Sequence, residues 1–304
     1  MYDIIIIGGG PSALAAAIYA ARQKVNFILI AENIGGQILW SSDIENYLGF
    51  KSITGMELVP KFQEQMEHNK VTIKEEKVLS LEKKGSYLTV KTSENNSYDS
   101  KTILIASGKK PRKLGIPGED QFLGKGVAYC ALCDAALFPE KIVAVVGGGN
   151  AAMDAALLIE KYASKVYIIT INQSLMGEPY MVDEIKKSKK INVIANAKTT
   201  SIVGDKFVKG ISIEVGNEKK TVPVEGVFVE IGSIPSVEFD NLTKKNKYNE
   251  IMICGNETIS NMTSVSGIFA AGDVTDVQEK QVIVAAGEGV KAVLGIFKYL
   301  QTLK

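Results

Sequence analysis

The sequence of 304 residues predicts an α/β protein with two similar units, each of which starts with a buried parallel strand. Residues 2–7 and 141–146 are apolar runs without polar alternation, which is typical of central parallel strands covered on both faces. Each run is followed by a turn of the form G-x-G-x-x-A, then by a helical segment and a further strand. The length suits two domains, and 46% hydrophobic residues are enough to bury two cores.

The first turn comprises residues 8–13, with Gly8, Gly10 and Ala13 at its three small positions. A helix at 14–23 and a strand at 26–31 complete the unit, and Glu32 follows that strand directly. Small residues let the backbone approach a pyrophosphate at a helix N-terminus, and a carboxylate after the second strand accepts hydrogen bonds from an adenosine ribose. Because all these parts occur in order, we interpret the unit as a Rossmann-like dinucleotide site.

The next part of the chain is rich in β-structure. Residues 71–92 and 99–105 read as strands, and the second of these runs ends in small residues. Residues 113–118 have the proline and glycine content of an interdomain hinge, and a second crossing is expected near residues 232–235. Candidate hinge residues are Gly115, Gly118 and Gly232.

Cys130 and Cys133, followed by Asp134, form a Cys-x-x-Cys pair between the two units. Two thiols at the start of a helical turn can form and reopen a disulfide with little backbone movement, and the helix N-terminus stabilises a thiolate. The same spacing is also half of a zinc site, but a structural zinc site needs four Cys or His ligands. The chain has only one other cysteine, Cys254, and one histidine, His68, so we expect a redox pair and no metal. Cys254 lies in an apolar run and is expected to be buried, whereas His68 is expected on an exposed helix face.

Residues 147–152 repeat the glycine turn, with Gly147, Gly149, Asn150 and Ala151 as the candidate contacts to a second nucleotide. A helix at 153–161 and a strand at 165–171 follow, and the chain ends on a helix at 281–300. Two such units around a Cys pair indicate electron transfer between a dinucleotide, a flavin and a disulfide.

Charge and hydropathy exclude several other classes. A net charge of +1 gives no reason to expect nucleic acid or an anionic membrane as partner. The apolar stretch at 4–21 lacks a basic flank and is interrupted by the glycine turn, so we expect neither a signal peptide nor a spanning helix. A reversible Cys pair in a chain with few cysteines suits a reducing cytoplasm.

Taken together, these motifs resemble the low-molecular-weight thioredoxin reductases of the pyridine nucleotide-disulfide oxidoreductase family, over essentially the whole chain. The resemblance implies an α/β fold of two Rossmann-like domains, the second inserted into the first, with a small β-rich piece in each. Residues 1–114 and 240–304 would then form the FAD-binding domain, and residues 115–239 the inserted nucleotide-binding-like domain with the Cys pair. The family resemblance rests on the motifs at residues 8–11, 35–37, 45–49, 107–108, 111–112, 116–119, 124–127, 129–134, 267–274, 280–282 and 285–289.

The resemblance also implies a set of FAD contacts. Asp273 would contact the ribityl chain, Gln281 and Val282 the flavin ring, and Asn46 would approach the ring from the other side. A homodimer and a thioredoxin-like or glutaredoxin-like protein partner are expected on the same ground. The full set of expected FAD contacts is Gly8, Gly10, Pro11, Ser12, Ala13, Glu32, Gly36, Gln37, Asn46, Gly108, Gly272, Asp273, Lys280, Gln281 and Val282.

In the mechanism that the resemblance implies, the flavin reduces the disulfide through Cys133, and the dithiol then exchanges with a protein disulfide. The inserted domain would rotate about its hinges between these two steps. Opening a disulfide also needs a proton for the leaving thiolate, and Asp134 is the adjacent acid if burial raises its pKa. The alternative is that Asp134 only caps the following helix.

The electron donor is left open by the sequence. NADPH-dependent members of the family carry a His-Arg-Arg cluster after the second strand of the inserted domain, where this chain reads Thr-Ile-Asn-Gln-Ser at 170–174. An acid for the ribose of NADH is missing there too. The basic run at 186–190 either reaches a phosphate or lies on a solvated helix face. The donors considered are therefore weakly bound NADPH or NADH, reduced ferredoxin, and a deazaflavin. The rival functions are a redox-silent FAD-binding regulatory protein and a peroxide-reducing system that uses the same dithiol.

Overall fold

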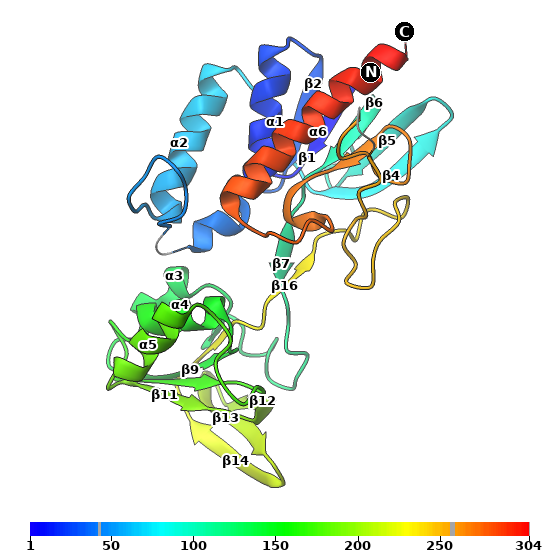
Figure 1. Ribbon diagram of the computed structural model, residues 1–304. Coiled ribbons are helices and arrows are strands. Elements are labelled where there is room, and N and C mark those ends of the chain that lie inside the picture. The colour runs from blue at the N-terminus through cyan, green and yellow to red at the C-terminus, as the bar shows by residue number, and fades with distance from the viewer. Residues whose placement is uncertain (42–43, 256–258, 304) are drawn as a thin grey trace. The chain divides into compact units, whose positions relative to one another are not determined.

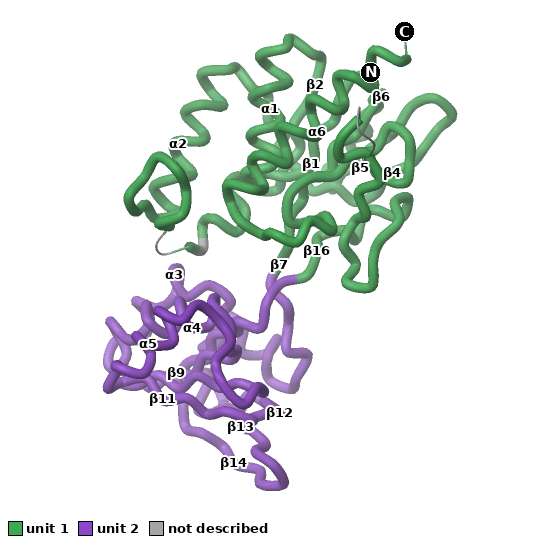
Figure 2. Tube along the Cα trace, in the orientation of Figure 1, with its two compact units in different colours: residues 1–110, 234–304 green, residues 111–233 purple. Residues whose placement is uncertain are grey.

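The computed structural model describes residues 1–41, 44–255 and 259–303 (Figure 1). The chain forms two compact units, residues 1–110 with 234–304 and residues 111–233 (Figure 2). The boundaries between the units along the chain therefore follow residues 110 and 233, whereas the sequence predicted boundaries after residues 114 and 239. Two short strands, β7 (Lys109–Pro111) and β16 (Ser233–Pro235), pair with each other where the chain crosses between the units.

The first unit is built on a seven-stranded sheet with the order β3-β2-β1-β6-β5-β4, in which β17 also pairs with β6. The strands β1, β2, β3, β6 and β17 are parallel, whereas β4 and β5 form an antiparallel extension. The isoleucines of β1 are almost completely buried, as expected for a strand covered on both faces. The strands are β1 (Tyr2–Ile7), β2 (Phe27–Ala31), β3 (Ile73–Glu75), β4 (Val78–Lys84), β5 (Tyr87–Thr92), β6 (Ser97–Ile105) and β17 (Ile268–Ala270).

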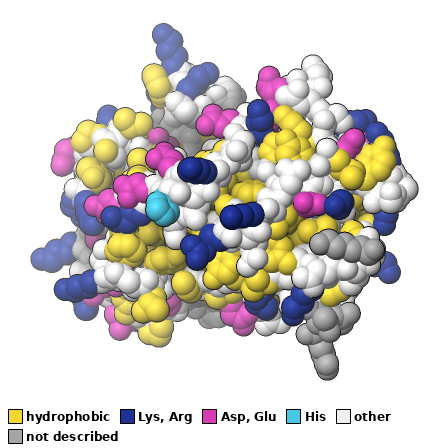
Figure 3. All heavy atoms as spheres, turned by 90° about the horizontal axis from the view of Figure 1, so that it is seen from above, with side chains coloured by type: hydrophobic (Ala, Val, Ile, Leu, Met, Phe, Trp, Pro, Cys, Tyr) yellow, Lys and Arg dark blue, Asp and Glu magenta, His cyan; other side chains and the backbone are white. Residues whose placement is uncertain are grey.

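Helices α1 (Pro11–Arg22) and α6 (Val282–Thr302) lie side by side on one face of this sheet (Figure 1). Helix α1 starts three residues earlier than expected because Pro11 occupies its first turn and Gly10 is its N-cap. Helix α2 (Gly55–His68) begins with a capping box and ends at His68, which lies at the surface (Figure 3). Two 3₁₀ helices, η1 (Gly36–Trp40) and η3 (Gly272–Val274), complete the unit.

The second unit has a five-stranded parallel sheet with the order β11-β10-β9-β15-β8. Alternate side chains of this sheet pack on α4 and α5 on one face and on a three-stranded antiparallel sheet on the other. The elements are β8 (Val127–Ala128), α3 (Ala131–Asp134), η2 (Ala135–Leu137), β9 (Ile142–Val146), α4 (Asn150–Ile159), β10 (Lys165–Ile169), α5 (Pro179–Lys187), β11 (Ile191–Ile194), β12 (Ala197–Gly204), β13 (Val208–Val215), β14 (Glu218–Pro223) and β15 (Gly226–Val229). The predicted fold class, with its two Rossmann-like sheets and a β-rich piece in each unit, is confirmed.

The candidate hinge glycines are not equivalent. All three have positive φ angles, 68° at Gly115, 90° at Gly118 and 90° at Gly232. A Cβ atom at Gly118 would lie 2.0 Å from the carbonyl oxygen of Ile202, so that glycine is required by packing on β12. The other two have open space around them, and their role as hinges stays a prediction.

The expectation for Cys254 was wrong, because its side chain is exposed. The apolar run around it is not a strand of the sheet: Ile251 is fully buried, but Met252 points outward. Among the described residues, no helix is both long and apolar enough to cross a membrane.

Candidate active site

A cavity of ≈ 1020 Å³ opens at the carboxyl ends of β1, β2 and β6 in the first unit. Ligands of open parallel sheets bind at this edge, where the loops after neighbouring strands diverge. Most of the expected FAD contacts line this cavity, although they come from seven separate segments of the chain. Those that line it are Gly8, Gly10, Pro11, Ser12, Glu32, Gly36, Gln37, Asn46, Gly108, Asp273, Lys280, Gln281 and Val282.

The glycine turn after β1 has the shape that a pyrophosphate needs. Gly8 has a φ of 125°, and a Cβ atom there would lie 2.2 Å from the carbonyl oxygen of Ala106. A Cβ atom at Gly10 would meet nothing within 4 Å, so the space in front of helix α1 is open. No side chain caps the N-terminus of α1, whose backbone N–H groups are therefore available to an anion.

Ser12 gives independent support for a ligand at this turn. Its side chain is only 4% exposed, and its Oγ atom has no hydrogen-bond partner within the described part of the chain. A buried hydroxyl without a partner costs free energy unless a ligand satisfies it. Since Ser12 lines the cavity in the first turn of α1, a pyrophosphate oxygen is a suitable partner. These features fit FAD.

The two ends of the cavity differ in character. Glu32 lies after β2 at the end where the adenosine is expected, and its carboxylate is exposed and 3.7 Å from the ammonium of Lys77. At the other end, the amide of Asn46 donates a hydrogen bond of 3.1 Å to Oε1 of Gln281. The structure thus brings together two residues that are 235 positions apart and that were both expected at the flavin ring.

Two expected contacts do not line the cavity. Ala13 is completely buried and packs in the core behind the glycine turn. Gly272 has a φ of 76°, and a Cβ atom there would lie 2.9 Å from Cβ of Ser12. Gly272 therefore leaves room for the side chain of Ser12.

Lys109 is a cavity residue that sequence reasoning missed. Its ammonium lies 3.0 Å from Oε1 of Glu250, and the ammonium of Lys280 lies 3.4 Å from the same oxygen. Burial raises the pKa of Asp273 and lowers that of Lys280, which is consistent with a partly dehydrated charge cluster. In the sequence, the only sign that Lys109 lines the cavity is that it directly follows Gly108.

We expect Ser12→Ala to weaken FAD binding by roughly 1.5–3 kcal/mol, the usual contribution of a hydrogen bond to a charged group, or about 10- to 100-fold in Kd. The variant should not destabilise the FAD-free protein, because it removes a hydroxyl that has no partner there. Fluorescence titration of the FAD-free protein and its thermal unfolding measure the two effects. Ser100→Ala is the matched control, because Ser100 Oγ is also buried without a partner but does not line the cavity. An equal loss of affinity in both variants would contradict the assignment.

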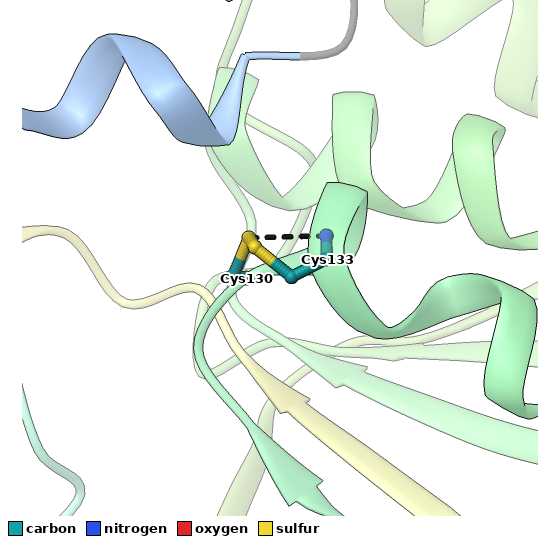
Figure 4. The surroundings of a disulfide bond; sticks show 2 residues. All are labelled: Cys130 and Cys133. Carbon is teal, nitrogen blue, oxygen red and sulfur yellow. Dashed lines mark hydrogen bonds between the residues drawn. A yellow bond between two sulfur atoms is a disulfide. The ribbon is translucent and has the colours of Figure 1, made fainter. Parts of the chain in front are cut away.

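The second unit carries the disulfide between Cys130 and Cys133 (Figure 4). Cys130 follows β8 as the N-cap of α3, and its Sγ atom accepts a hydrogen bond of 3.1 Å from the amide of Cys133. Cys130 is half-buried, whereas Cys133 is exposed. The disulfide is therefore accessible at the end of a parallel strand, and the amide of Cys133 is placed to stabilise a thiolate on Cys130.

Asp134 is half-buried at the end of α3, and this burial raises the pKa of its carboxyl. The residue precedes η2, but its side chain makes no capping hydrogen bond there. The alternative role as a helix cap therefore has no support in the geometry. A carboxyl that holds its proton to a higher pH is suited to protonate a thiolate.

The second glycine turn lies at the same edge of the sheet as the Cys pair. A Cβ atom at Gly147 would lie 2.1 Å from the carbonyl oxygen of Glu230, so packing alone requires this glycine. A Cβ atom at Gly149 would meet only the carbonyl oxygen of Met176, at 3.7 Å, and Ala151 is exposed. The side chain of Asn150, however, accepts a hydrogen bond of 2.8 Å from the amide of Glu178. This geometry is compatible with both a nucleotide site and a scaffold.

Three of the four lysines in the basic run at 186–190 have partners away from the glycine turn. The ammonium of Lys190 donates to the carbonyl oxygens of Glu160 and Ala163, at 3.0 and 2.9 Å, beyond the C-terminal end of α4. The glycine turn is at the opposite end of that helix. Lys186 and Lys187 form ion pairs with acids one turn earlier on α5, at 3.6 and 2.8 Å. Within the described ranges, no group of three or more His, Cys, Asp or Glu is arranged to hold a metal ion.

Comparison with known proteins agrees with this site. The family model described as pyridine nucleotide-disulphide oxidoreductase matches residues 2–289. The F subunit of the alkyl hydroperoxide reductase of Staphylococcus epidermidis is 37% identical over 303 residues, which are 98% of this chain and 59% of that protein. The chain thus spans little more than half the length of the curated relatives it matches.

Two solved structures are similar over their whole length. The thioredoxin reductase of Lactococcus lactis is 32% identical, with a TM-score of 0.93 and coverage of 99% of this chain and 100% of that one. The thioredoxin reductase of T. acidophilum is 34% identical, with a TM-score of 0.89 and coverage of 100% and 99%. The predicted family is confirmed. This chain, with its cavity at one glycine turn and its Cys pair beside another, belongs to the pyridine nucleotide-disulphide oxidoreductase family and has the fold of thioredoxin reductases.

Proposed function

We propose that the protein is an FAD-dependent disulfide oxidoreductase that reduces the disulfide of a thioredoxin-like or glutaredoxin-like protein. The observation that carries this proposal is the accessible Cys130–Cys133 disulfide next to the half-buried acid Asp134. The dinucleotide cavity of the first unit supports FAD as the cofactor. The likeness to thioredoxin reductases supports a small redox protein as the acceptor. A homodimer stays an expectation from the family resemblance.

The residues have distinct roles in this proposal. Bound FAD supplies two electrons to the disulfide. The exposed Cys133 is the sulfur that accepts them, and the leaving thiolate takes a proton from Asp134. The resulting dithiol exchanges with the partner disulfide, for which one thiol must first ionise. We assign FAD to the unit of residues 1–110 and 234–304, and the dithiol chemistry to the unit of residues 111–233.

The test is a single-turnover experiment that does not depend on the natural donor. The flavin is reduced anaerobically with one equivalent of dithionite, and an oxidised thioredoxin is added in excess. Reoxidation of the flavin with the appearance of about one thioredoxin dithiol per flavin supports the proposal. A redox-silent FAD-binding protein would keep its flavin reduced and release no dithiol.

A peroxide-reducing system is the second candidate, because the chain is 37% identical to the F subunit of the S. epidermidis alkyl hydroperoxide reductase. In that case the same dithiol would recharge a peroxidase, directly or through another carrier. Adding a peroxidase and an alkyl hydroperoxide to the reduced protein distinguishes the two. Loss of peroxide without added thioredoxin favours the peroxidase as the direct partner, whereas loss only with thioredoxin present favours the first candidate.

We expect NADPH to reduce the flavin no faster than NADH does. Thr170, at the strand end where a 2′-phosphate would be bound, is buried, and its hydroxyl accepts a hydrogen bond of 3.2 Å from the amide of Asn172. Three lysines of the basic run are engaged elsewhere, as described above. Without charge-assisted hydrogen bonds, the phosphate has no favourable partner.

Anaerobic bleaching of the flavin absorbance, with each nucleotide added separately at millimolar concentration, measures this preference. Similar rates with both nucleotides, or no bleaching by either, agree with the proposed absence of a phosphate site. In the second case, reduced ferredoxin and a deazaflavin are the donors to test next. Bleaching by NADPH at least tenfold faster than by NADH would contradict the prediction.

A further inference from the structure

Glu230 is a half-buried carboxyl that the proposed mechanism does not use. It follows β15, which lies between β8 and β9 in the parallel sheet of the second unit. The register pairs Phe228 with Ala128 of β8 and with Val145 of β9. Beyond these pairs, Glu230 and Cys130 each lie two residues further along the chain, at the edge of the sheet where Gly147 follows β9.

The strand geometry of β15 continues as far as Glu230, whereas β8 ends at Ala128 and Tyr129 forms a bend before Cys130. The amide of Glu230 donates a hydrogen bond of 2.8 Å to the carbonyl oxygen of Val146, which extends the ladder beyond the end of β15. The backbone of Cys130 is extended as well, with a φ of −134° and a ψ of 99°. Neighbouring strands of a sheet lie about 4.8 Å apart. A glutamate side chain is long enough to bridge that separation.

Alternation along the strands places both side chains on the same face of the sheet. Ala128 and Phe228 pack together in the core against α4, and residues 130 and 230 have the same parity. The face of α4 also carries Asp154, whose negative charge acts on Glu230. Burial raises the pKa of Glu230 to about 8, and the charge of Asp154 contributes in the same direction.

We propose that Glu230 is a second proton-holding carboxyl of the redox site, in addition to Asp134, and that it lies beside Cys130. Its functional role rests on the proposed function, but its placement does not. Reduction of the disulfide adds two electrons, breaks the S–S bond and leaves two sulfur anions that take up two protons. Asp134 gives one proton and Glu230 the other, and both carboxylates recover their protons from water.

In the reduced protein, the thiol of Cys130 and the carboxyl of Glu230 then titrate as a coupled pair. The charged group that acts on Glu230 from a neighbouring element is Asp154 on α4, and the disulfide of Cys130 and Cys133 follows β8 at the same edge of the sheet. A thiol normally ionises near pH 8.5, close to the value for Glu230. When Glu230 is charged, it opposes formation of a thiolate on Cys130, so ionisation of either group raises the pKa of the other.

Alkylation of the reduced protein tests this placement. The full-length protein with its flavin is reduced with a phosphine, treated with iodoacetamide between pH 5.5 and 10, and mapped by mass spectrometry. We expect Glu230→Gln to lower the apparent pKa of the Cys130 thiol by about half a unit or more, with up to ~3-fold more thiolate above pH 8, because the negative charge that Glu230 carries there in the wild type is removed. Glu230→Asp keeps the charge and should leave the profile close to that of the wild type.

The protein offers two controls. Cys254 is exposed and far from β15 in the sequence, so it is an internal reference thiol in every sample. Glu225 directly precedes β15 at the opposite end of the strand, where it is exposed and pairs with Lys141 at 2.6 Å. Glu225→Gln should therefore leave the Cys130 profile unchanged. If the profile of Glu230→Gln coincides with that of the wild type, the proposal is wrong.

Thermal unfolding shows whether the variant folds. Since the pKa of Glu230 is raised in the folded protein, its ionisation destabilises the fold progressively as the pH rises toward about 8. Glu230→Gln lacks this loss, so its melting temperature at pH 9 should be equal to or above that of the wild type. The alkylation profile needs neither the natural donor nor the partner. It therefore reports on Glu230 even if the thioredoxin assay fails.

Discussion

Replacement of Cys133 with serine is expected to lower the rate of protein-disulfide reduction by on the order of 10³-fold or more, as loss of an essential catalytic group does. Without Cys133 no internal disulfide can form, so electrons on the flavin have no route to the partner. Flavin binding should be unaffected, because Cys133 belongs to the second unit and the dinucleotide cavity to the first. The single-turnover assay with dithionite-reduced protein and oxidised thioredoxin measures this loss.

Cys254→Ser is the matched control for this variant. Cys254 is also exposed, but it has no disulfide partner within the described part of the chain, and its substitution should leave turnover unchanged. Turnover of Cys133→Ser within tenfold of the wild type would show that the flavin reaches the partner by another route. The same experiment separates a working dithiol enzyme from an FAD-binding regulatory protein, which would show no turnover in either form.

The parts of the fold that the sequence predicts are those with a local cause. A strand covered on both faces needs an unbroken apolar run, and a dinucleotide turn needs small residues at fixed spacing. Residues 2–13 and 141–152 meet both conditions, and both regions fold as expected. Helix boundaries were less accurate because the N-cap depends on the turn geometry, which placed Pro11 inside α1.

The parts that the sequence did not predict depend on contacts between distant residues. Lys109 and Glu250 form an ion pair although they are 141 positions apart, and no spacing rule connects them. The exposure of Cys254 was missed for a related reason. An apolar run indicates burial only where the backbone continues as a strand or helix, and residues 252–255 do neither.

The redox site likewise combines local features, which the sequence predicts, with contacts between distant residues, which it does not predict. The Cys-x-x-Cys spacing and the adjacent Asp134 are local, so the sequence was sufficient to propose them. Glu230 lies 100 positions away from Cys130, and the parallel pairing of β15 with β8 brings both residues to the same edge of the sheet. The sequence alone marks it as one acid at the end of an apolar run. The register of the sheet is what relates it to the disulfide.

Asp134→Asn is expected to slow opening of the disulfide by about 10²-fold or more at neutral pH, the usual contribution of a general acid. Burial raises the pKa of Asp134, so its carboxyl keeps a proton to higher pH than an exposed aspartate does. The wild-type rate should fall as the pH rises through this raised pKa, because the proton donor is lost. The variant should lack that fall, since an amide does not titrate, and should keep only a fall near pH 8 where Glu230 ionises. Stopped-flow reoxidation of the reduced flavin between pH 5 and 9 measures both profiles.

Asp183→Asn is the control for the effect of removing an acid from the same unit. Asp183 is exposed on α5, where it pairs with Lys186 at 3.6 Å, and its loss should change neither the rate nor the profile. If Asp134 had only a structural role, Asp134→Asn would be less stable than the wild type, but its rate would still fall as the pH rises. Because a raised pKa means that the folded protein favours the neutral acid, the neutral Asn should not destabilise the protein above the normal pKa of an aspartate. Full turnover in Asp134→Asn would leave Glu230 as the remaining candidate acid beside the disulfide, and the double variant with Glu230→Gln would then decide whether either carboxyl supplies the proton.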